Sequence, residues 1–454
     1  MSRSALWEAA VGVLRANDLG GRTKPAPRLY PHQWSWDSAF IAIGLAHVDP
    51  DRALSELESL FAAQWADGRV PHIVFDPAAR GYFPGPDRWA CATLADAAPR
   101  APATSGLVQP PVHALAAWHI YQTTSDPATL RARFEALYPR LLAWHRYLAT
   151  ARDPEGSGLL TTYHPWESTD NSPRWDAPLA NVEVGAVPPY ERHDLKHVAD
   201  PSERPTQAEY DRYLWLVESL KAARYDDATI RRAHPFLVKD VLFSAIFAAA
   251  NEALGRIAEV AGAPDAARAE IGRWGRRAGA AVRRQIDAEQ RLALDLDLRT
   301  GAPIRVRTCA GLAPLLVPSL ERRTAGALVE QLTGPSFAGA PVLAFPVVPS
   351  AAPGSPGFRP RAYWRGPSWP VVNWLLWWGL RRQGYAEQAA ALRGANLALL
   401  ARPGARFSEY FEPYTGEQLG SSEQSWTAAV ALDWLAHDES REGGPAAEAP
   451  RPVS

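Results

Sequence analysis

Helical periodicity recurs along almost the whole chain and constrains its fold more than any other feature. Apolar residues return at helical spacing in segment after segment, and several of these segments open with Pro or with an Asp or Ser cap. The pattern predicts roughly twelve helices, at residues 5–16, 38–47, 50–65, 111–121, 127–149, 207–223, 235–261, 265–286, 319–332, 367–382, 386–400 and 425–436. Strand-like patterns are confined to residues 292–298 and 304–307, which disfavours a parallel sheet with crossover helices.

A chain with this many helices can form a bundle, a solenoid or a closed ring of paired helices. Its 454 residues are enough for one closed helical ring or for two ordinary domains. No segment repeats at a fixed period, which disfavours a solenoid. The segments between the helices therefore have to indicate which arrangement is present.

Short segments rich in tryptophan and carboxylates lie just before or after the predicted helices. They span residues 30–37, 164–176, 363–369, 407–416 and 423–426. Indole faces pack on the C–H faces of a sugar ring, and carboxylates and amides hydrogen-bond to its hydroxyls. If these loops gather at one end of a ring of helices, they form a carbohydrate-binding pocket. The alternative is that the 18 tryptophans are core anchors; Trp374, Trp377 and Trp378 could pack in the core or serve an interface.

Two long segments carry few helical signals. Residues 165–205 are rich in Pro and charged groups, and residues 337–367 are rich in Pro, Gly and Ser. Long irregular segments in a compact domain are often functional, so both are expected to cover the pocket, with surface decoration as the alternative. Residues 439–454 are expected to be a disordered tail, and residues 1–438 are expected to form a single domain with these two segments as insertions.

Composition limits the partners and the compartment. A net charge of −1 and a pI near 6.9 provide no global field for nucleic acid or an anionic membrane, so any anion must be recognised locally. Only Cys91 and Cys309 occur, which fits a reducing compartment. No signal-peptide core or long uninterrupted apolar stretch is apparent. We expect a soluble, cytoplasmic protein with a small-molecule substrate; the sequence leaves homo-oligomer formation open.

Cofactor and metal motifs find no support. His32, His72 and His164 invite a metal hypothesis, but none belongs to an HExxH pair or stands at ligand spacing from a cysteine. The chain has no GxGxxG opening a helix after a strand, no GxxxxGK[ST] and no GxSxG. We therefore expect no cofactor, no metal, and neither nucleotide-dependent nor serine-hydrolase chemistry.

Hydrolysis of a glycosidic bond needs one protonated carboxylic acid and one carboxylate. Asp170 lies between Trp166 and Trp175, which could desolvate it and raise its pKa as a proton donor requires. Alternatively, Asp170 caps a turn with Asn171 and Ser172. The nearby carboxylates are weaker candidates with structural roles; they are Glu167 and Asp176.

The residues alone do not decide which side chain is the second carboxylate. Glu409 and Glu412 both lie among aromatic residues, and only their relation to the rest of the site can choose between them. Asp37 follows Trp34 and Trp36 at the start of a predicted helix. It either binds sugar hydroxyls or serves as a helix N-cap.

At these segments the chain resembles the inverting α-glycosidases with an (α/α)6 toroid, and within them glycoside hydrolase family 63, of the mannosylglycerate and glucosylglycerate hydrolase type. The likeness runs from about Tyr30 to Trp426 and covers several motifs in one order. It implies an all-α (α/α)6 toroid, a general acid at Asp170 and a general base at Glu409 rather than Glu412. It also implies a third acidic residue of the sugar subsite at Asp37. Further pocket positions are implied at Tyr30, Trp36, Gln109, Trp364, Trp369 and Gln424. Trp34 and Trp166, which belong to the same aromatic segments, are expected to bind substrate as well.

The acid motif departs from the pattern of many relatives. They place a Gly and one further residue between the Ser and the Asp, whereas only Thr169 separates Ser168 from Asp170 here. This shorter spacing between Ser168 and Asp170 could change the direction of the Asp170 side chain, on which its role as the general acid depends.

The same resemblance implies that Arg204 binds the carboxylate of glycerate, with Tyr363 as a hydroxyl partner. A guanidinium suits this because its planar fork makes two hydrogen bonds to a carboxylate; the alternative is a solvated loop arginine. The implied activity is inverting hydrolysis of glucosylglycerate and/or mannosylglycerate with release of D-glycerate. Two alternatives are an α-glucosidase or trehalase-like hydrolase of neutral disaccharides and a non-catalytic sugar-binding protein.

Overall fold

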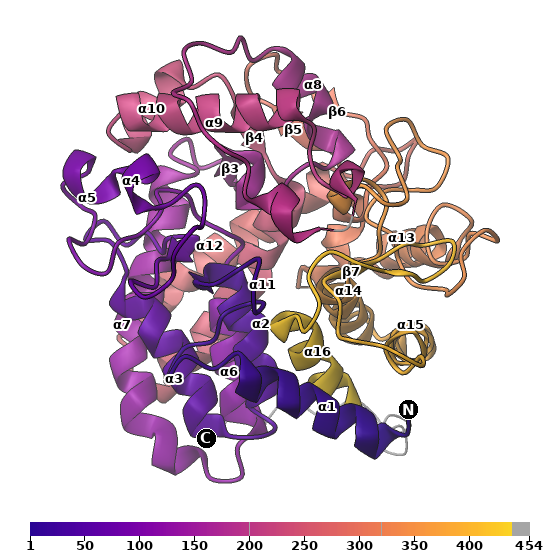
Figure 1. The fold of residues 1–454 in the computed structure, drawn as a ribbon. Coiled ribbons are helices and arrows are strands. Elements are labelled where there is room, and N and C mark those ends of the chain that lie inside the picture. The colour runs from indigo at the N-terminus through magenta and orange to yellow at the C-terminus, as the bar shows by residue number, and fades with distance from the viewer. Residues whose placement is uncertain (199, 319, 438–454) are drawn as a thin grey trace.

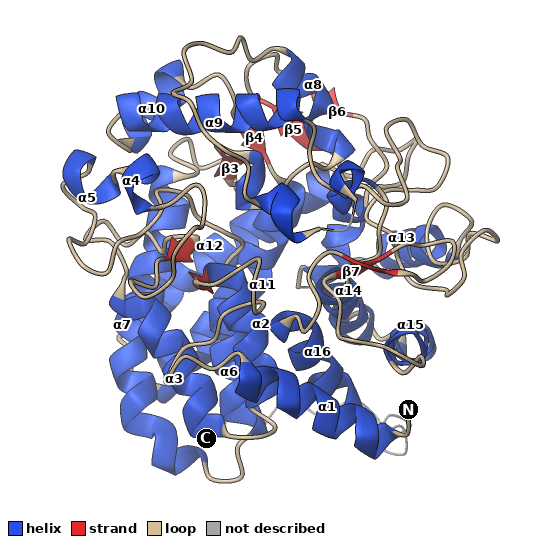
Figure 2. Ribbon diagram, in the orientation of Figure 1, coloured by secondary structure: helices blue, strands red, loops and turns tan. Residues whose placement is uncertain are grey.

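Helices dominate the computed structural model, which describes residues 1–198, 200–318 and 320–437 (Figures 1 and 2). All twelve predicted helices are confirmed. They are α1 (Arg3–Ala16), α2 (Ser35–Leu45), α3 (Pro50–Ala62), α6 (His113–Thr123), α7 (Pro127–Ala151), α9 (Gln207–Ala222), α11 (Val241–Val260), α12 (Asp265–Arg284), α13 (Arg322–Thr333), α14 (Pro370–Arg382), α15 (Ala386–Leu400) and α16 (Ser425–Ala436). The predicted tail, residues 439–454, lies outside the described residues.

Short elements fill the connections. Four short helices are α4 (Pro86–Trp89), α5 (Cys91–Leu94), α8 (Asp176–Ala180) and α10 (Asp227–Ala233). Six 3₁₀ helices are η1 (Pro165–Glu167), η2 (Pro173–Trp175), η3 (Asp194–His197), η4 (Pro201–Glu203), η5 (Cys309–Leu316) and η6 (Tyr363–Arg365). Four of the six lie within residues 165–205 and one within residues 337–367, so both long segments are locally folded.

The helices contact one another in a circuit that returns to its start. The contacts run from α2 to α6, α11, η5, α14 and α16, and α16 packs back on α2 (Figure 1). Each member also packs against a second helix, in the pairs α2 with α3, α6 with α7, α11 with α12, η5 with α13, α14 with α15 and α16 with α1. The last helix of the described chain is thereby held against the first part of the chain.

Strands are short, and every pairing within the described residues is antiparallel. β1 (Gln33–Trp34) pairs with β2 (Ile73–Val74), and β7 (Tyr410–Phe411) pairs with β8 (Gln418–Leu419). A four-stranded sheet has the order β3 (Thr161–Thr162), β4 (Val238–Lys239), β5 (Asp295–Asp297), β6 (Pro303–Ile304). The helix predicted at residues 235–261 begins late because β4 takes its first residues. Asp240 then caps α11 by accepting a hydrogen bond from the Phe243 N–H at 3.0 Å.

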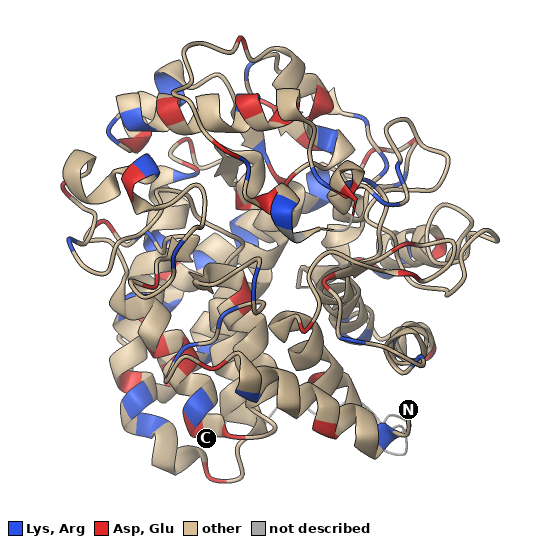
Figure 3. Cartoon of the chain, viewed as in Figure 1, with Lys and Arg blue, Asp and Glu red and all other residues tan. Residues whose placement is uncertain are grey.

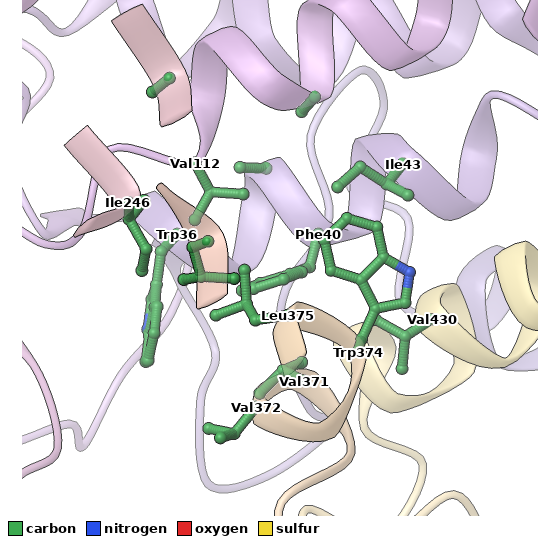
Figure 4. Close-up of a cluster of buried hydrophobic side chains, with 14 of the residues drawn as sticks. Trp36, Phe40, Ile43, Val112, Ile246, Val371, Val372, Trp374, Leu375 and Val430 are labelled. Atoms are coloured by element: carbon green, nitrogen blue, oxygen red, sulfur yellow. The ribbon is translucent and has the colours of Figure 1, made fainter. Parts of the chain in front are cut away.

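The core lies between the inner faces of the circuit. Trp36 and Phe40 of α2 pack with Trp374 of α14 and neighbouring aliphatic side chains (Figure 4). Trp374 and Trp377 are almost fully buried, which supports core packing for α14. Within the described chain, α11 is the one helix long and apolar enough to cross a membrane, but 83% of its apolar window is buried inside the protein, as in a core helix.

Charged residues are interspersed rather than segregated. Figure 3 shows basic and acidic positions alternating over helices and loops, in keeping with the net charge of −1.

Candidate active site

A cavity of about 270 Å³ gathers the aromatic and carboxylate segments predicted from the sequence. It is walled by the N-terminal ends of α2 and α16, by the segment before α6, and by the two long loops. Of the predicted site residues, those that line it are Tyr30, Trp34, Trp36, Asp37, Gln109, Trp166, Asp170, Arg204, Tyr363, Trp364, Glu409 and Gln424. Segments separated by hundreds of residues thus meet around one volume large enough for a small sugar derivative.

Trp369 is the one predicted pocket residue that does not reach the cavity. Its ring stacks on that of Trp364, with centroids 3.7 Å apart and planes 4° from parallel. Trp369 is the N-cap residue of α14 and is 1% exposed. It therefore backs the indole of Trp364 and fixes the plane that this indole presents to the cavity.

Glu409 precedes β7 and is held by donors on both carboxylate oxygens. Its Oε1 accepts from the Tyr30 hydroxyl at 2.8 Å and from the Tyr363 hydroxyl at 3.4 Å. Its Oε2 accepts from the Ser421 N–H at 3.1 Å and the Ser421 hydroxyl at 3.2 Å. A carboxylate that accepts several hydrogen bonds is favoured in its ionised form. This arrangement suits a base held in one orientation.

Gly420 allows the β7–β8 hairpin to approach this carboxylate. Its φ is +70°, and a Cβ there would stand 2.6 Å from Glu409 Oε2 and 2.4 Å from the Tyr410 ring. Three non-glycine residues near the site also have positive φ: Tyr363 at 50°, Phe407 at 50° and Glu423 at 56°. Such backbone costs about 1–3 kcal/mol each and persists where the surrounding contacts hold it. The cavity wall is therefore built on conformations that favour positioning over local stability.

Asp170 lies in the turn that the sequence predicted. The turn closes through its backbone, since the Ser172 N–H donates to the Thr169 carbonyl at 2.9 Å, rather than through an Asp170 cap. The buried Arg174 donates to Ser168 Oγ at 2.9 Å and to Thr169 Oγ1 at 3.2 Å. Despite the shortened motif, Asp170 lines the cavity. The residue therefore belongs to a turn and to the pocket at the same time.

The two carboxyl groups have different electrostatic surroundings. Burial raises the pKa of Asp170 to about 7; the positive charge of Arg204 opposes the rise, and the negative charge of Glu409 adds to it. Burial also raises the pKa of Glu409 above its usual range, while Arg204 and the donors from Ser421 and Tyr30 oppose the rise. At neutral pH a substantial fraction of Asp170 is protonated, as a proton donor needs.

We expect the Asp170→Asn protein to be more heat-stable than the wild type at pH 8. Between the unfolded pKa near 4 and the native pKa of about 7, the native state binds more protons than the unfolded state, so stability falls as pH rises. At pH 8, ionisation of the buried Asp170 lowers the free energy of unfolding by at most about 4 kcal/mol. Asn does not ionise, so the variant avoids this loss. Thermal melts at pH 5 and pH 8 should show the advantage widening with pH. An advantage that stays constant or narrows as the pH rises would contradict a buried ionised Asp170.

The remaining carboxylates are occupied elsewhere. Glu167 pairs with the buried Arg152 at 2.7 Å, and Asp176 pairs with Arg365 at 2.6 Å. Glu412 accepts from the Thr415 N–H and hydroxyl, both at 2.7 Å. These contacts are consistent with structural roles for Glu167, Asp176 and Glu412. Of Glu409 and Glu412, Glu409 is the one that lines the cavity.

Asp37 is not a helix N-cap, which corrects one of the two sequence-based alternatives. Trp34 occupies the N-cap position of α2, and Asp37 lies in the first turn. Asp37 is 5% exposed. Burial raises its pKa, and the negative charges of Glu409 and Asp170 raise it further. Three carboxyl groups therefore share one electrostatic environment, with Asp37 placed to accept or donate to sugar hydroxyls.

Arg204 is buried against the site rather than solvated. Its guanidinium carbon lies 4.1 Å from the centroid of the Tyr363 ring, and Nη1 donates to the Tyr30 hydroxyl at 3.4 Å. Nε donates to Asp194 Oδ2 at 3.4 Å, and Arg192 holds the same carboxylate at 2.6 Å. The fork is thus stacked and oriented from one side. Both hydrogen bonds of the Arg204 guanidinium are 3.4 Å long. The guanidinium can therefore form shorter hydrogen bonds to the carboxylate of a ligand.

Several lining residues were not predicted. Trp426 belongs to the short segment at residues 423–426 that marked the region, but it was not named as a pocket position. Tyr82, His193, Asp194 and Tyr210 also line the cavity. Tyr82 lies in an irregular segment with no motif, His193 and Asp194 lie at the start of the short helix η3, and Tyr210 lies on an ordinary amphipathic helix. No local pattern in the sequence distinguishes them.

His32, His72 and His164 do not form a ligand group. The side chain of His164 hydrogen-bonds to the Tyr213 carbonyl at 2.9 Å, and His72 to Ser105 Oγ at 2.5 Å. His32 Nδ1 accepts from the Asp76 N–H at 3.1 Å. Burial lowers the pKa of His32 to about 4 and that of His72 to about 3, so both are neutral. They are polar core and wall residues.

The family model described as a mannosylglycerate hydrolase MGH1-like glycoside hydrolase domain matches residues 30–427. The chain belongs to this family. The glucosylglycerate hydrolase of Mycolicibacterium hassiacum is 49% identical over 432 residues, which cover 94% of this chain and 96% of that protein. The mannosylglycerate hydrolase of Thermus thermophilus is 44% identical over 427 residues, covering 94% and 99% respectively.

A solved member of the family has the same fold. The crystal structure of the family 63 mannosylglycerate hydrolase from Thermus thermophilus in complex with Tris and D-glycerate superposes with a TM-score of 0.87 at 43% identity, over 94% of this chain and 99% of that one. The predicted resemblance to glycoside hydrolase family 63 is therefore confirmed, and this family member is a glycosidase.

Proposed function

We propose that this enzyme hydrolyses glucosylglycerate, and mannosylglycerate with it, by a single displacement that inverts the anomeric carbon and releases D-glycerate. The observation that carries the proposal is the meeting of Asp170 and Glu409 in one aromatic-walled cavity, with Asp170 at a pKa of about 7. The 49% identical relative is a glucosylglycerate hydrolase, which supports the glucosyl substrate.

In this mechanism Asp170 protonates the oxygen that links sugar to glycerate. Glu409, held by Tyr30, Tyr363 and Ser421, takes a proton from the water that attacks the opposite face of the sugar ring. Room for that water requires the two carboxyl groups to stand roughly 6.5 to 9.5 Å apart. Trp36 and Trp364, whose ring centroids are 6.2 Å apart, supply flat apolar surface for the sugar.

Glycerate carries the charge that a neutral disaccharide lacks, and Arg204 is proposed to bind it. The side chain is 9% exposed, stacked on Tyr363, and close enough to Asp170 and Glu409 to oppose the rise of both pKa values. In a protein of net charge −1, this buried guanidinium supplies the local anion site expected from the sequence.

We also propose that the scaffold is a single (α/α)6 toroid over residues 1–438 and that the protein is cytoplasmic. The closed circuit of six inner elements, each with one outer partner, supports the toroid. Cys91 and Cys309 are both buried free thiols, which supports a reducing compartment.

The product assay decides the substrate. Purified protein is incubated with glucosylglycerate, mannosylglycerate, trehalose and kojibiose, and released sugar and glycerate are quantified. We expect kcat/KM on the glycerate glycosides to exceed that on the neutral disaccharides by at least about 10²-fold, because a desolvated charge pair is worth several kcal/mol. Comparable turnover of trehalose would replace the proposal with the neutral-sugar hydrolase, and binding without turnover would indicate a sugar-binding protein.

Arg204→Gln is expected to lower kcat/KM on glucosylglycerate by about 10²-fold, because the glycerate carboxylate loses its buried partner. Glucosylglycerol, which lacks that carboxylate, should lose far less, so the preference between the two substrates collapses. Arg80→Gln, an exposed cation on the same cavity, is the matched control and should preserve the preference. Equal losses on both substrates would show that Arg204 positions the site rather than binding glycerate.

A further inference from the structure

A second cluster of ligand-type side chains lies at the other end of the inner helices. It consists of His47, just after α2, His119 in α6 and Asp433 in α16. Asp37 lies in the first turn of α2 and Gln424 is the N-cap residue of α16, so the cluster is about 15 Å along these helices from the cavity. None of the three residues lines the cavity.

The three ligand atoms converge on one point. His47 Nε2 lies 2.7 Å from Asp433 Oδ1, His119 Nε2 lies 3.0 Å from the same oxygen, and the two nitrogens are 3.3 Å apart. Ligand atoms at the 2.0–2.1 Å bond lengths of tetrahedral Zn²⁺ are separated by roughly 3.3 Å. The triangle therefore needs only a slight expansion to hold such an ion above its plane.

Hydrogen bonds can account for two of the three edges. Two neutral imidazoles with hydrogen on Nε2 can both donate to Asp433 Oδ1, whose lone pairs suffice for both. The third edge then brings His47 Nε2 and His119 Nε2 to 3.3 Å with no hydrogen bond between them. A cation, with the hydrogens on Nδ1 of both rings, would use all three atoms as ligands.

The surroundings orient the carboxylate and leave access from outside. Asp433 Oδ2 accepts from Trp374 Nε1 at 2.7 Å, which leaves Oδ1 directed at the two histidines. The Asp433 side chain is 1% exposed, whereas those of His47 and His119 are 12% and 21% exposed. A bound ion could thus take water as its fourth ligand. His437 Nδ1 hydrogen-bonds to the Asp433 backbone carbonyl at 2.9 Å, so this nitrogen is occupied outside the triangle.

We propose that His47 Nε2, His119 Nε2 and Asp433 Oδ1 bind one divalent transition-metal ion, with Zn²⁺ the best match to two imidazoles and one carboxylate in a tetrahedral arrangement. The ion stabilises the fold and takes no part in hydrolysis. It links α16 to α2 across 386 residues and so fastens the closure of the helical circuit. The sequence shows no such site because its three ligands follow no short-range spacing.

The test uses the full-length, tag-free protein after chelation and dialysis. Titration with Zn²⁺ by calorimetry and with Co²⁺ by visible absorption should show one equivalent bound with a micromolar or tighter Kd. The Co²⁺ spectrum should have the intense bands of a four-coordinate ion, and Zn²⁺ should raise the Tm by a few degrees. His47→Gln and His119→Gln should each weaken binding at least tenfold and abolish the Tm shift.

His193→Gln, a partly buried histidine outside the cluster, is the control and should bind as the wild type does. Absence of one-to-one binding in the wild type, or equal binding in His119→Gln, would overturn the proposal. Because His119 is the more exposed ligand, its variant carries the test if His47→Gln fails to fold. Hydrolase activity is expected with and without the ion, so the outcome is independent of the proposed reaction.

Discussion

Replacing Asp170 by Asn is expected to lower kcat on glucosylglycerate by about 10³-fold or more, because glycerate is a poor leaving group without protonation. The amide keeps the shape of the side chain but donates no proton. α-Glucosyl fluoride departs as fluoride and needs little acid assistance, so the same variant should lose less than about tenfold on it. Steady-state kinetics on the two substrates measures the contrast.

Two results would contradict the assignment of Asp170. Near-normal turnover of glucosylglycerate would show that another group supplies the proton. An equal loss on the fluoride would show that the substitution disturbs the site rather than removing an acid. Asp176→Asn is the matched control, because Asp176 lies six residues further on and pairs with Arg365 outside the cavity; its kcat should change by less than about tenfold.

Replacing Glu409 by Gln is expected to abolish turnover of both substrates, by about 10⁴-fold, because water must be deprotonated whatever the leaving group. The glutamine can still meet some of the donors from Tyr30, Tyr363 and Ser421, so the fold should persist. Kinetics together with a circular dichroism melt separates lost chemistry from lost structure.

Glu412→Gln provides the matched comparison for this position. Glu412 is three residues away and equally buried, but its carboxylate is taken up by Thr415. We expect a lower Tm and nearly unchanged kcat. If Glu412→Gln were inactive and Glu409→Gln active, the two assignments would have to be exchanged.

Helical periodicity was enough to find the twelve main helices, but their ends depended on tertiary contacts. The apolar run at residues 236–238 continues the pattern of α11, yet its last residue, Val238, pairs in β4 with β3 and β5. Trp34 is a predicted pocket residue and also occupies the N-cap position of α2, without a side-chain cap hydrogen bond. That helix begins three residues before its predicted start. The ends of such elements are set by hydrogen bonds between segments that are distant in the sequence, and the sequence of one segment does not specify these bonds.

The cavity could be predicted where aromatic and carboxylate residues are dense along the chain. Glu409 and Glu412 could not be separated from the residues alone, because the choice depends on Ser421, Tyr30 and a hairpin that closes only in three dimensions. Trp369 has the same local signature as Trp364 but stacks behind it. Residues such as Tyr82 and Asp194 carry no such signature, because the connecting segments that bring them to the cavity follow no local sequence pattern.

Time-resolved NMR of the first sugar released from an α-linked glycerate glycoside tests the pairing of Asp170 and Glu409 most directly. A proton donor and a water-activating carboxylate on opposite sides of the anomeric carbon predict that the β anomer appears first and later equilibrates. Initial release of the α anomer would contradict the single displacement and with it the role of Glu409 as the base that activates water.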